Sequence, residues 1–219
     1  MSEQLIFNFP FKKSYLSQDF YVSENNIKAF NLIESWPNWS SRFINIFGPK
    51  GCGKTHLINI LNTKIDSVIL PANKVDSNAL LKYKIKECLI IDDFNNQIDE
   101  KLFYTIANMG SQDNKYLIVT SRLPIVNLNF SLKDLNSRAK SFLLYNVEKP
   151  DDDMMFAIIL KNLSDKQISL DKKLIDFIIK RIDRSYSKIF EFIYKIDELS
   201  LKKKKSIDLK IIKEVLEDC

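Results

Sequence analysis

Residues 48–55 form the sequence feature that most restricts what this chain can fold into. They read Gly-Pro-Lys-Gly-Cys-Gly-Lys-Thr, which matches the phosphate-binding loop pattern G-x-x-x-x-G-K-[ST]. The mostly apolar residues 42–47 before the loop predict a buried strand, and residues 54–61 after it predict the opening of a helix. The chain has only four glycines and three of them lie in this loop, which argues against a chance turn.

The residue types of this loop suit a phosphate ligand. Gly48, Gly51 and Gly53 let the backbone curl so that successive N–H groups face one anion, and the helix that follows adds its positive dipole. We expect Lys54 to reach the β- and γ-phosphates and the Thr55 hydroxyl to bind Mg²⁺. The sequence therefore predicts a site for ADP or ATP with Mg²⁺. Its predicted cofactor-binding residues are Gly48, Gly51, Cys52, Gly53, Lys54 and Thr55.

Length, composition and charge indicate one folded unit in a reducing compartment. The chain has 219 residues, 45% of them hydrophobic, so it can bury a sizeable core. No apolar run approaches the roughly 18 residues of a membrane span, and residues 1–4 lack the layout of a signal peptide. The three cysteines are an odd number, which favours reduced thiols. We therefore expect a cytoplasmic protein with no membrane partner.

The net charge of +5 permits nucleic-acid contact without requiring it. Residues 202–205 are the one dense basic run, four consecutive lysines. We interpret them as a solvated turn between two helices, with a phosphate-binding patch as the alternative.

Downstream of the loop, apolar strand-like segments alternate with helix-like ones. The further predicted strands are residues 67–71, 88–92, 116–120 and 142–147. Residues 100–109 are an example of the helix-like segments between them. Continuous apolar strands separated by helices imply a parallel sheet that is covered on both faces.

After Pro150 the pattern becomes entirely helical. The predicted amphipathic helices are residues 151–163, 171–182, 185–201 and 208–216. The predicted fold class is thus α/β, a five-stranded parallel sheet with helices on both faces followed by a small all-helical lid. The predicted organisation is an extended tail at 1–10, a nucleotide-binding core at 11–149 and the lid at 150–219.

The predicted strand at 88–92 runs into two carboxylates, Asp92 and Asp93. An acid at the carboxyl end of such a strand faces the phosphates bound by the loop. Asp92 would then hold Mg²⁺, mostly through water, and Asp93 would orient or deprotonate an attacking water. The alternative is a simple turn from Asp93 into residues 94–96, because Asp-Asp after a strand is common.

Two later segments also carry candidate site residues. Thr120 and Ser121 end the predicted fourth strand, where a polar side chain can contact the γ-phosphate or the water; a turn into Pro124 is the alternative. Arg138 precedes the predicted fifth strand and can project into the nucleotide of a neighbouring subunit, where it would stabilise charge that develops on phosphoryl transfer. By spacing alone, Arg138 is better interpreted as an ordinary surface arginine.

In their order along the chain, these motifs resemble those of the DnaA family of AAA+ proteins, over almost the whole length. Residues 19–26 look like the family's adenine-side box, and residues 53–57, including His56, look like its phosphate loop. Residues 90–93, 120–124 and 135–138 resemble its Walker B, sensor 1 and box VII motifs. The resemblance implies cofactor-binding roles for Phe20, Tyr21, Val22 and His56, and it implies that Arg138 is a catalytic finger acting in trans. It agrees with the roles already expected for Thr55 and Asp92 in binding metal, for Asp92 and Thr120 in binding the cofactor, and for Asp93 in catalysis.

Within the family, the chain resembles a short regulator that inactivates the replication initiator, DnaA. The initiator continues into a helix-turn-helix domain, whereas this chain stops at Cys219, so we expect no dedicated domain for sequence-specific DNA binding. Residues 4–10 resemble the motif with which such regulators dock on the β sliding clamp of DNA polymerase III. Gln4 would bond at the pocket edge, and the apolar pockets would be filled by Leu5, Phe7 and Phe9. The alternative is an arm packed on the core.

One position departs from the family pattern. The family has a sensor 2 arginine in the third lid helix, where this chain has Ser187. Lys188 points about 100° away on a helix, and Arg184 lies one turn earlier. A neutral residue here weakens the case for self-hydrolysis, so we expect at most weak intrinsic ATPase activity.

Two functions follow from these observations. The favoured one is a nucleotide-bound regulator that binds the sliding clamp and promotes hydrolysis of DnaA-bound ATP, with homo-oligomerisation left open. The alternative is an AAA+ ATPase that acts on its own nucleotide, such as a helicase loader or a short initiator paralogue. Intact Lys54, Thr55, Asp92 and Asp93 support the alternative.

Overall fold

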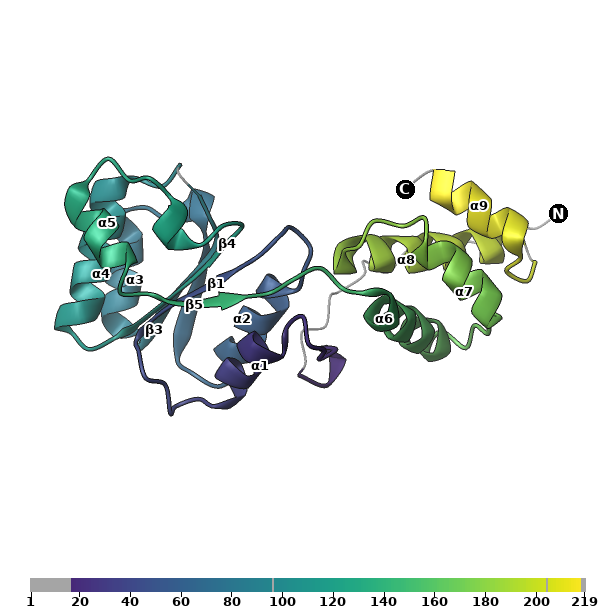
Figure 1. Ribbon diagram of the computed structural model, residues 1–219, viewed down its shortest axis with the longest axis horizontal. Helices are drawn as coiled ribbons and strands as arrows, with labels where there is room; N and C mark the ends of the chain where they lie inside the picture. Colours follow the sequence, from purple (N-terminus) through teal and green to yellow (C-terminus); the bar gives the residue numbers. More distant parts are fainter. Residues whose placement is uncertain (1–16, 96, 204, 218–219) are drawn as a thin grey trace.

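The computed structural model describes residues 17–95, 97–203 and 205–217. Figure 1 shows two parts, an α/β part that holds the sheet and a bundle of helices that holds the carboxyl-terminal third of the chain. The predicted clamp-binding residues Gln4, Leu5, Phe7 and Phe9 lie outside the described residues. Their role therefore stays a prediction.

The α/β part is built on a five-stranded sheet in which every neighbouring pair is parallel. The strands are β1 (Phe43–Phe47), β2 (Ser67–Pro71), β3 (Cys88–Phe94), β4 (Tyr116–Ser121) and β5 (Leu143–Asn146). Their order across the sheet is β2-β3-β4-β1-β5, so the phosphate loop after β1 lies beside the ends of β4 and β3. The predicted fold class is confirmed.

Helices cover both faces of the sheet (Figure 1). Side chains alternate along the strands, so that Leu89 and Ile91 of β3 join one hydrophobic cluster while Cys88 and Ile90 join the other. The first cluster includes residues of α3 (Ser77–Ile85), α4 (Glu100–Gln112) and α5 (Lys133–Ala139). The second includes residues of α1 (Ile27–Glu34) and α2 (Lys54–Asn62). Because both faces of the sheet are buried, its strands are continuous apolar runs in the sequence.

Short 3₁₀ turns occupy Ser17–Asp19, Ala72–Lys74 and Ile125–Asn127.

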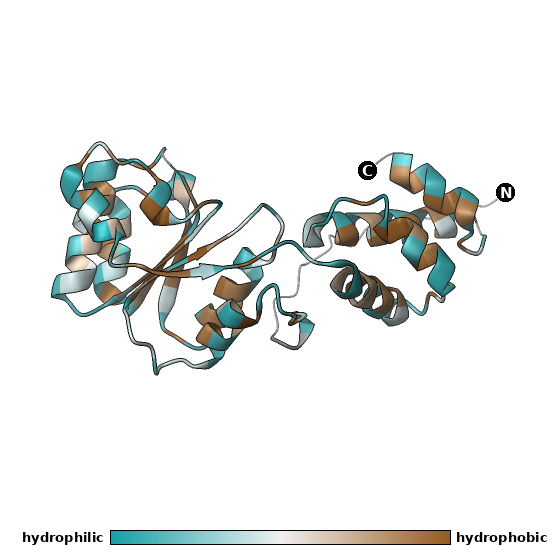
Figure 2. Ribbon diagram, in the orientation of Figure 1, coloured by the Kyte–Doolittle hydropathy of each residue, from teal (hydrophilic) through white to brown (hydrophobic). Residues whose placement is uncertain are grey.

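The lid consists of α6 (Asp152–Asp165), α7 (Lys172–Ile179), α8 (Tyr186–Lys203) and α9 (Leu209–Glu217). Their apolar faces pack against one another in a third cluster, which contains no residue of the α/β part. Figure 2 shows the hydrophobic stripes of these helices. Asp151 begins α6 as its N-cap, and its carboxylate accepts a hydrogen bond from the amide of Met154 at 2.8 Å.

The basic run at 202–205 agrees only in part with the predicted turn between two helices, because Lys205 lies between α8 and α9 but the first two lysines do not. Lys202 and Lys203 are the last two residues of α8 and not part of a loop. Their ammonium groups pair with Glu198 at 2.6 Å and with Glu214 at 2.5 Å, which helps the helix continue to this point. None of the helices among the described residues is long and apolar enough to cross a membrane.

The lid is joined to the core through residues 147–151 and touches it at further places, among them an ion pair between Lys161 of α6 and Asp19 at 3.0 Å. On the core side, the amide of Asn25 donates to the carboxylate of Asp151 at 3.1 Å. At the start of α8, the backbone N–H of Tyr186 donates to the carbonyl of Gly51 at 3.0 Å. The lid therefore contacts the phosphate loop directly.

Candidate functional site

The phosphate loop has a backbone shape that its glycines make possible. Gly48, Gly51 and Gly53 have φ angles of 154°, 79° and 104°. A Cβ atom at Gly48 would lie 2.0 Å from the carbonyl oxygen of Val147, and one at Gly51 would lie 2.4 Å from the Cβ of Ser185. Both the φ angles and the close neighbours thus require glycine, as the sequence predicted.

The curled loop presents backbone donors to one place. The N–H groups of residues 50–53 have no acceptor among the described residues. The amino end of α2, which begins at Lys54, adjoins them. Unpaired amides beside a helix amino end form an anion site, because an anion supplies the missing acceptors.

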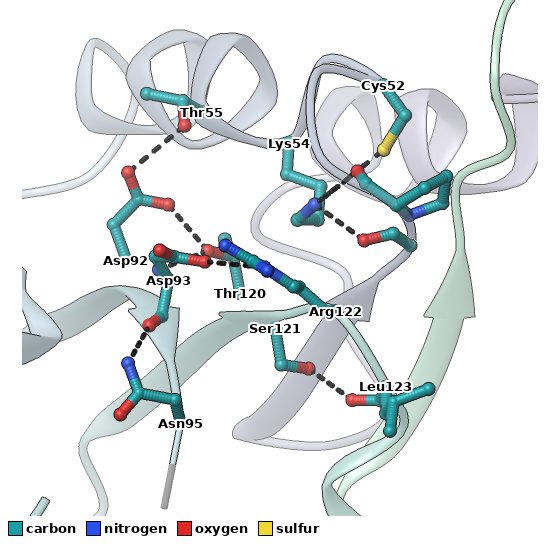
Figure 3. A network of polar contacts seen from close by, with 12 residues as sticks. Cys52, Lys54, Thr55, Asp92, Asp93, Asn95, Thr120, Ser121, Arg122 and Leu123 are labelled. Atoms are coloured by element: carbon teal, nitrogen blue, oxygen red, sulfur yellow. Dashed lines mark hydrogen bonds and ion pairs between the residues drawn. The ribbon is translucent and has the colours of Figure 1, made fainter. Parts of the chain in front are cut away.

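Lys54 and Cys52 occupy the interior of this loop. The side chain of Lys54 is 8% exposed, and its ammonium donates to the carbonyls of Gly48 at 2.7 Å and Pro49 at 2.8 Å (Figure 3). The sulfur of Cys52 lies 3.8 Å from the same nitrogen. Burial raises the pKa of the Cys52 thiol, against the lowering effect of Lys54, so the thiol is more strongly protonated than an exposed cysteine.

Asp92 is the centre of a polar network at the ends of β3 and β4 (Figure 3). Its carboxylate accepts hydrogen bonds from the hydroxyls of Thr55 at 3.0 Å and Thr120 at 2.5 Å. The Thr120 hydroxyl accepts in turn from the amide of Asp93 at 2.9 Å. The structure thus brings together Thr55, Asp92 and Thr120, which the sequence had predicted from three separate motifs.

The oxygens of Thr55 and Asp92 are of the kind that Mg²⁺ prefers. In the described parts of the chain, no group of three or more His, Cys, Asp and Glu side chains can hold a metal ion. A hydroxyl and a single carboxylate fit Mg²⁺ when the nucleotide and water supply the remaining oxygens. The donor set therefore fits a nucleotide-bound Mg²⁺ and does not fit a metal bound by protein alone.

Asp93 lies in a bulge at the end of β3 and not in the alternative turn. The register of β3 with β4 shifts between Ile91 and Phe94, and Asp93 has a φ of 56°. A bulge redirects the side chains of the residues within it. The Asp93 carboxylate is 65% exposed and lies 3.9 Å from the Nε of Arg122.

Sequence reasoning missed Asn45, which is fully buried in β1. Its side-chain amide donates to the Val119 carbonyl at 3.0 Å and to the Ser121 hydroxyl at 2.8 Å, and its oxygen accepts from the amide of Ile125 at 2.8 Å. These bonds satisfy all the polar atoms of the side chain and fix the segment that follows β4. An asparagine inside an otherwise apolar strand is the signal that would have found it.

The predicted adenine-side residues divide into two groups. Phe20 is buried, with its ring centroid 5.2 Å from that of His56 and 6.4 Å from that of Tyr186. Tyr21 and Val22 are 40% and 37% exposed. Tyr186, at the start of α8, was not among the predicted site residues, because only the packing of the lid on the core brings it to the loop.

The basic residues near the missing lid arginine are engaged elsewhere. Arg184 pairs with Asp152 at 2.5 Å, and Lys188 pairs with Glu191 at 2.9 Å. Both acids belong to the lid. The structure therefore gives neither residue a phosphate-facing position in place of Ser187.

Arg138 lies on α5, on the opposite face of the sheet from α2. Its guanidinium donates to the side-chain oxygens of Asn108 and, at 3.4 Å, of Ser111, both on α4. The structure does not bring Arg138 to the phosphate loop of its own chain. Its predicted role in trans stays a prediction.

Two family models match this chain. The model for the Hda lid domain matches residues 151–216, which contain α6 to α9. A model for RNA helicase matches residues 44–125, which contain the phosphate loop and the strand that ends in Asp92. The two matches cover different parts of the chain.

Curated relatives are replication initiators. The chromosomal replication initiator protein DnaA of Borrelia turicatae (strain 91E135) is 28% identical over 237 residues, which cover 94% of this chain and 49% of the relative. The chain therefore spans about half the length of the curated relatives it matches.

Solved structures share the fold. Domain III of the Thermotoga maritima replication initiation protein DnaA has a TM-score of 0.78 at 19% identity and covers 96% of this chain and 98% of that one. AMPPCP-bound DnaA from Aquifex aeolicus has a TM-score of 0.70 at 22% identity and covers 87% of this chain and 69% of that one. The lid match, the initiator relatives and this shared architecture together support the resemblance predicted from the sequence, that of an Hda-like AAA+ protein of the DnaA family.

Proposed function

We propose that this protein is a nucleotide-binding regulator of replication initiation that promotes hydrolysis of DnaA-bound ATP while it is attached to the DNA polymerase sliding clamp. The observation that carries the proposal is the set of unpaired amides at residues 50–53, placed between Lys54, the Thr55–Asp92 pair and the lid. A fold relative, DnaA from Aquifex aeolicus, was solved with AMPPCP bound.

When the nucleotide binds, its phosphate oxygens would replace the backbone carbonyls that now accept hydrogen bonds from Lys54. The Lys54 ammonium would leave the carbonyls of Gly48 and Pro49 for phosphate oxygens, which make stronger, charge-assisted hydrogen bonds. Mg²⁺, when bound, would neutralise phosphate charge, and the Thr55 hydroxyl and Asp92 would hold it. The adenine would lie near Phe20 and Tyr186, where core and lid meet.

The action on DnaA would require Arg138 in trans. Its hydrogen-bond acceptors, Asn108 and Ser111, are neutral, so these contacts leave the charge of the guanidinium uncompensated. Its position on the far face of the sheet from the loop suits contact with another subunit rather than its own nucleotide. The clamp would bind the tail through Gln4, Leu5, Phe7 and Phe9.

The second candidate is an ATPase that hydrolyses its own nucleotide. The joined network of Thr55, Asp92, Thr120 and Asp93 favours it. The pairing of Arg184 and Lys188 with acids of the lid weighs against it, because these two cations are then not directed at the phosphates.

The test uses purified DnaA loaded with ATP, DNA-loaded clamp and this protein, with ADP production followed over time. A finger supplied in trans is worth roughly 10³-fold or more, so we expect Arg138→Ala to lose the stimulation while nucleotide and clamp binding persist. Arg181→Ala, a change to a surface arginine of the lid, is the matched control. Full stimulation by the Arg138 variant would contradict the trans mechanism, and ADP production without DnaA would favour the second candidate.

A further inference from the structure

The side chain of Arg138 is held in a defined direction by α4. Its guanidinium donates through one terminal nitrogen to the side-chain oxygen of Asn108, and through the other to the Ser111 hydroxyl at 3.4 Å. Arg138 and Asn108 are both half-buried. Two acceptors on one neighbouring helix leave the arginine fewer rotamers than a free surface arginine has. The two contacts therefore orient the guanidinium.

The helix α5, which carries this arginine, is itself fixed on α4, which lies beside it in Figure 1. The carboxylate of Glu100, in the first turn of α4, accepts from the amides of Ser131 and Leu132, each at 2.9 Å, just before α5 begins. Phe103 of α4 and Leu135 of α5 are buried in the same hydrophobic cluster. Because these contacts restrict the backbone of α5, the direction of the guanidinium depends mainly on its own two acceptors.

The two acceptors suit an arginine that must still bind an anion. A guanidinium carries more N–H groups than these two contacts use, so enough remain for a bidentate contact with phosphate oxygens. Asn108 is also neutral, whereas a carboxylate in its place would pair with the guanidinium and compete with the phosphate. Arg184 shows that second arrangement, because it pairs with Asp152 of the lid.

We propose that Asn108 is a positioning residue for the action of Arg138 in trans. It holds the guanidinium in the orientation in which the free N–H groups meet the phosphate of a nucleotide on another subunit, and it does not touch that nucleotide itself. Ordering the long side chain beforehand removes this cost from the reaction step. The inference rests on the proposed action on DnaA-bound ATP.

The experiment measures ADP production by ATP-loaded DnaA with DNA-loaded clamp, at rising concentrations of this protein. We expect Asn108→Ala to lower the maximal rate about 10-fold, because a misdirected group loses much of its effect, and to leave the half-maximal concentration unchanged. In the Arg138→Ala background, the same change should have no further effect. Thr105→Ala is the matched control, at an exposed residue of α4 whose hydroxyl donates to the Lys101 carbonyl of the same helix, and it should keep the parent's rate.

The variant Asn108→Asp distinguishes positioning from a merely structural role. Its carboxylate would pair with Arg138, so we expect the thermal stability of the parent together with a loss of stimulation at least as large as that of Asn108→Ala. A merely structural role would make stability and stimulation change together.

Three results would overturn the Asn108 proposal alone. They are full stimulation by Asn108→Asp, an unchanged maximal rate for Asn108→Ala, and a further loss from Asn108→Ala in the Arg138→Ala background. An unchanged maximal rate with a higher half-maximal concentration would mean that Asn108 contacts DnaA directly. A parent protein that does not stimulate hydrolysis would overturn the proposed function as well.

Discussion

The core and the lid contribute to the candidate site in different ways. On the core side, functional side chains bond to one another, with the hydroxyls of Thr55 and Thr120 both directed at Asp92. On the lid side, the contacts near the phosphate loop are a backbone hydrogen bond from Tyr186 to Gly51 and the packing of the Tyr186 ring near Phe20. Elsewhere, the Lys161–Asp19 ion pair and the hydrogen bond from Asn25 to Asp151 join the lid to the core. The core therefore provides the polar side chains of the candidate site, and the lid covers the phosphate loop.

This difference predicts that the two parts respond separately to mutation. The lid has its own hydrophobic cluster, and a backbone hydrogen bond and a ring contact each contribute only about 1 kcal/mol. Opening the lid would thus leave intact the two hydrophobic clusters of the α/β part and the separate cluster of the lid. The core, in contrast, contains a fully buried polar network, in which Asn45 bonds to the Val119 carbonyl, the Ser121 hydroxyl and the Ile125 amide.

The largest expected effect is on the core and follows from Asn45. Asn45→Ala leaves the amide of Ile125 and the carbonyl of Val119 without their buried partner, so we expect the free energy of unfolding to fall by about 3 kcal/mol. Chemical denaturation measures this change. Asn127→Ala, at an exposed asparagine nearby, should stay within about 0.5 kcal/mol of the parent. If both variants are equally stable, the buried network does not hold the end of β4.

The next effect concerns ligand binding to the core. Lys54→Ala removes a buried ammonium that would contact phosphate, and we expect ADP affinity to fall by about 2 kcal/mol, or roughly 30-fold. Fluorescence titration with a labelled ADP measures the loss. Lys50→Ala, at an exposed lysine of the same loop, should have a much smaller effect. Undiminished affinity in the Lys54 variant would count against this loop as the site.

The smallest effect is expected in the lid. Tyr186→Ala removes the ring beside Phe20 and should weaken ADP binding about fivefold, or about 1 kcal/mol, without changing the unfolding of the core. Tyr186→Phe keeps the ring and loses only weak bonds of the hydroxyl, at 3.5 Å to the Tyr21 carbonyl and 3.2 Å to the Met154 sulfur. It should bind like the parent. A loss of core stability in the Ala variant would show that lid and core are not separate.

The features that the sequence predicted are local in the chain, and those that it missed depend on contacts between distant residues. Buried parallel strands are continuous apolar runs, so all of them were found, with ends within two residues of those observed. The phosphate loop and Asp92 follow from local motifs. Asn45 and Tyr186 were missed because their roles come from partners far away along the chain.

Two further differences have local physical causes. The predicted turn at Lys202 and Lys203 is helical because these lysines find acidic partners in α8 and α9, and neutralised charges no longer favour a solvated loop. The turn given as the alternative for Asp93 is instead a bulge at the end of β3, which places the Asp93 carboxylate 3.9 Å from Arg122, and the expected action of Asp93 on water stays a prediction. Side-chain pairing of this kind does not appear in a pattern of apolar and polar residues.

The central claim is that the loop at the core–lid junction binds the nucleotide, and amide hydrogen exchange tests it most directly. The N–H groups of residues 50–53 have no acceptor among the described residues, so they should exchange fast in the free protein and become strongly protected with Mg²⁺-ADP. The segment around Ser185 and Tyr186 should be protected at the same time, because it contacts Gly51. Unchanged exchange at residues 50–53 under saturating ADP would contradict the account.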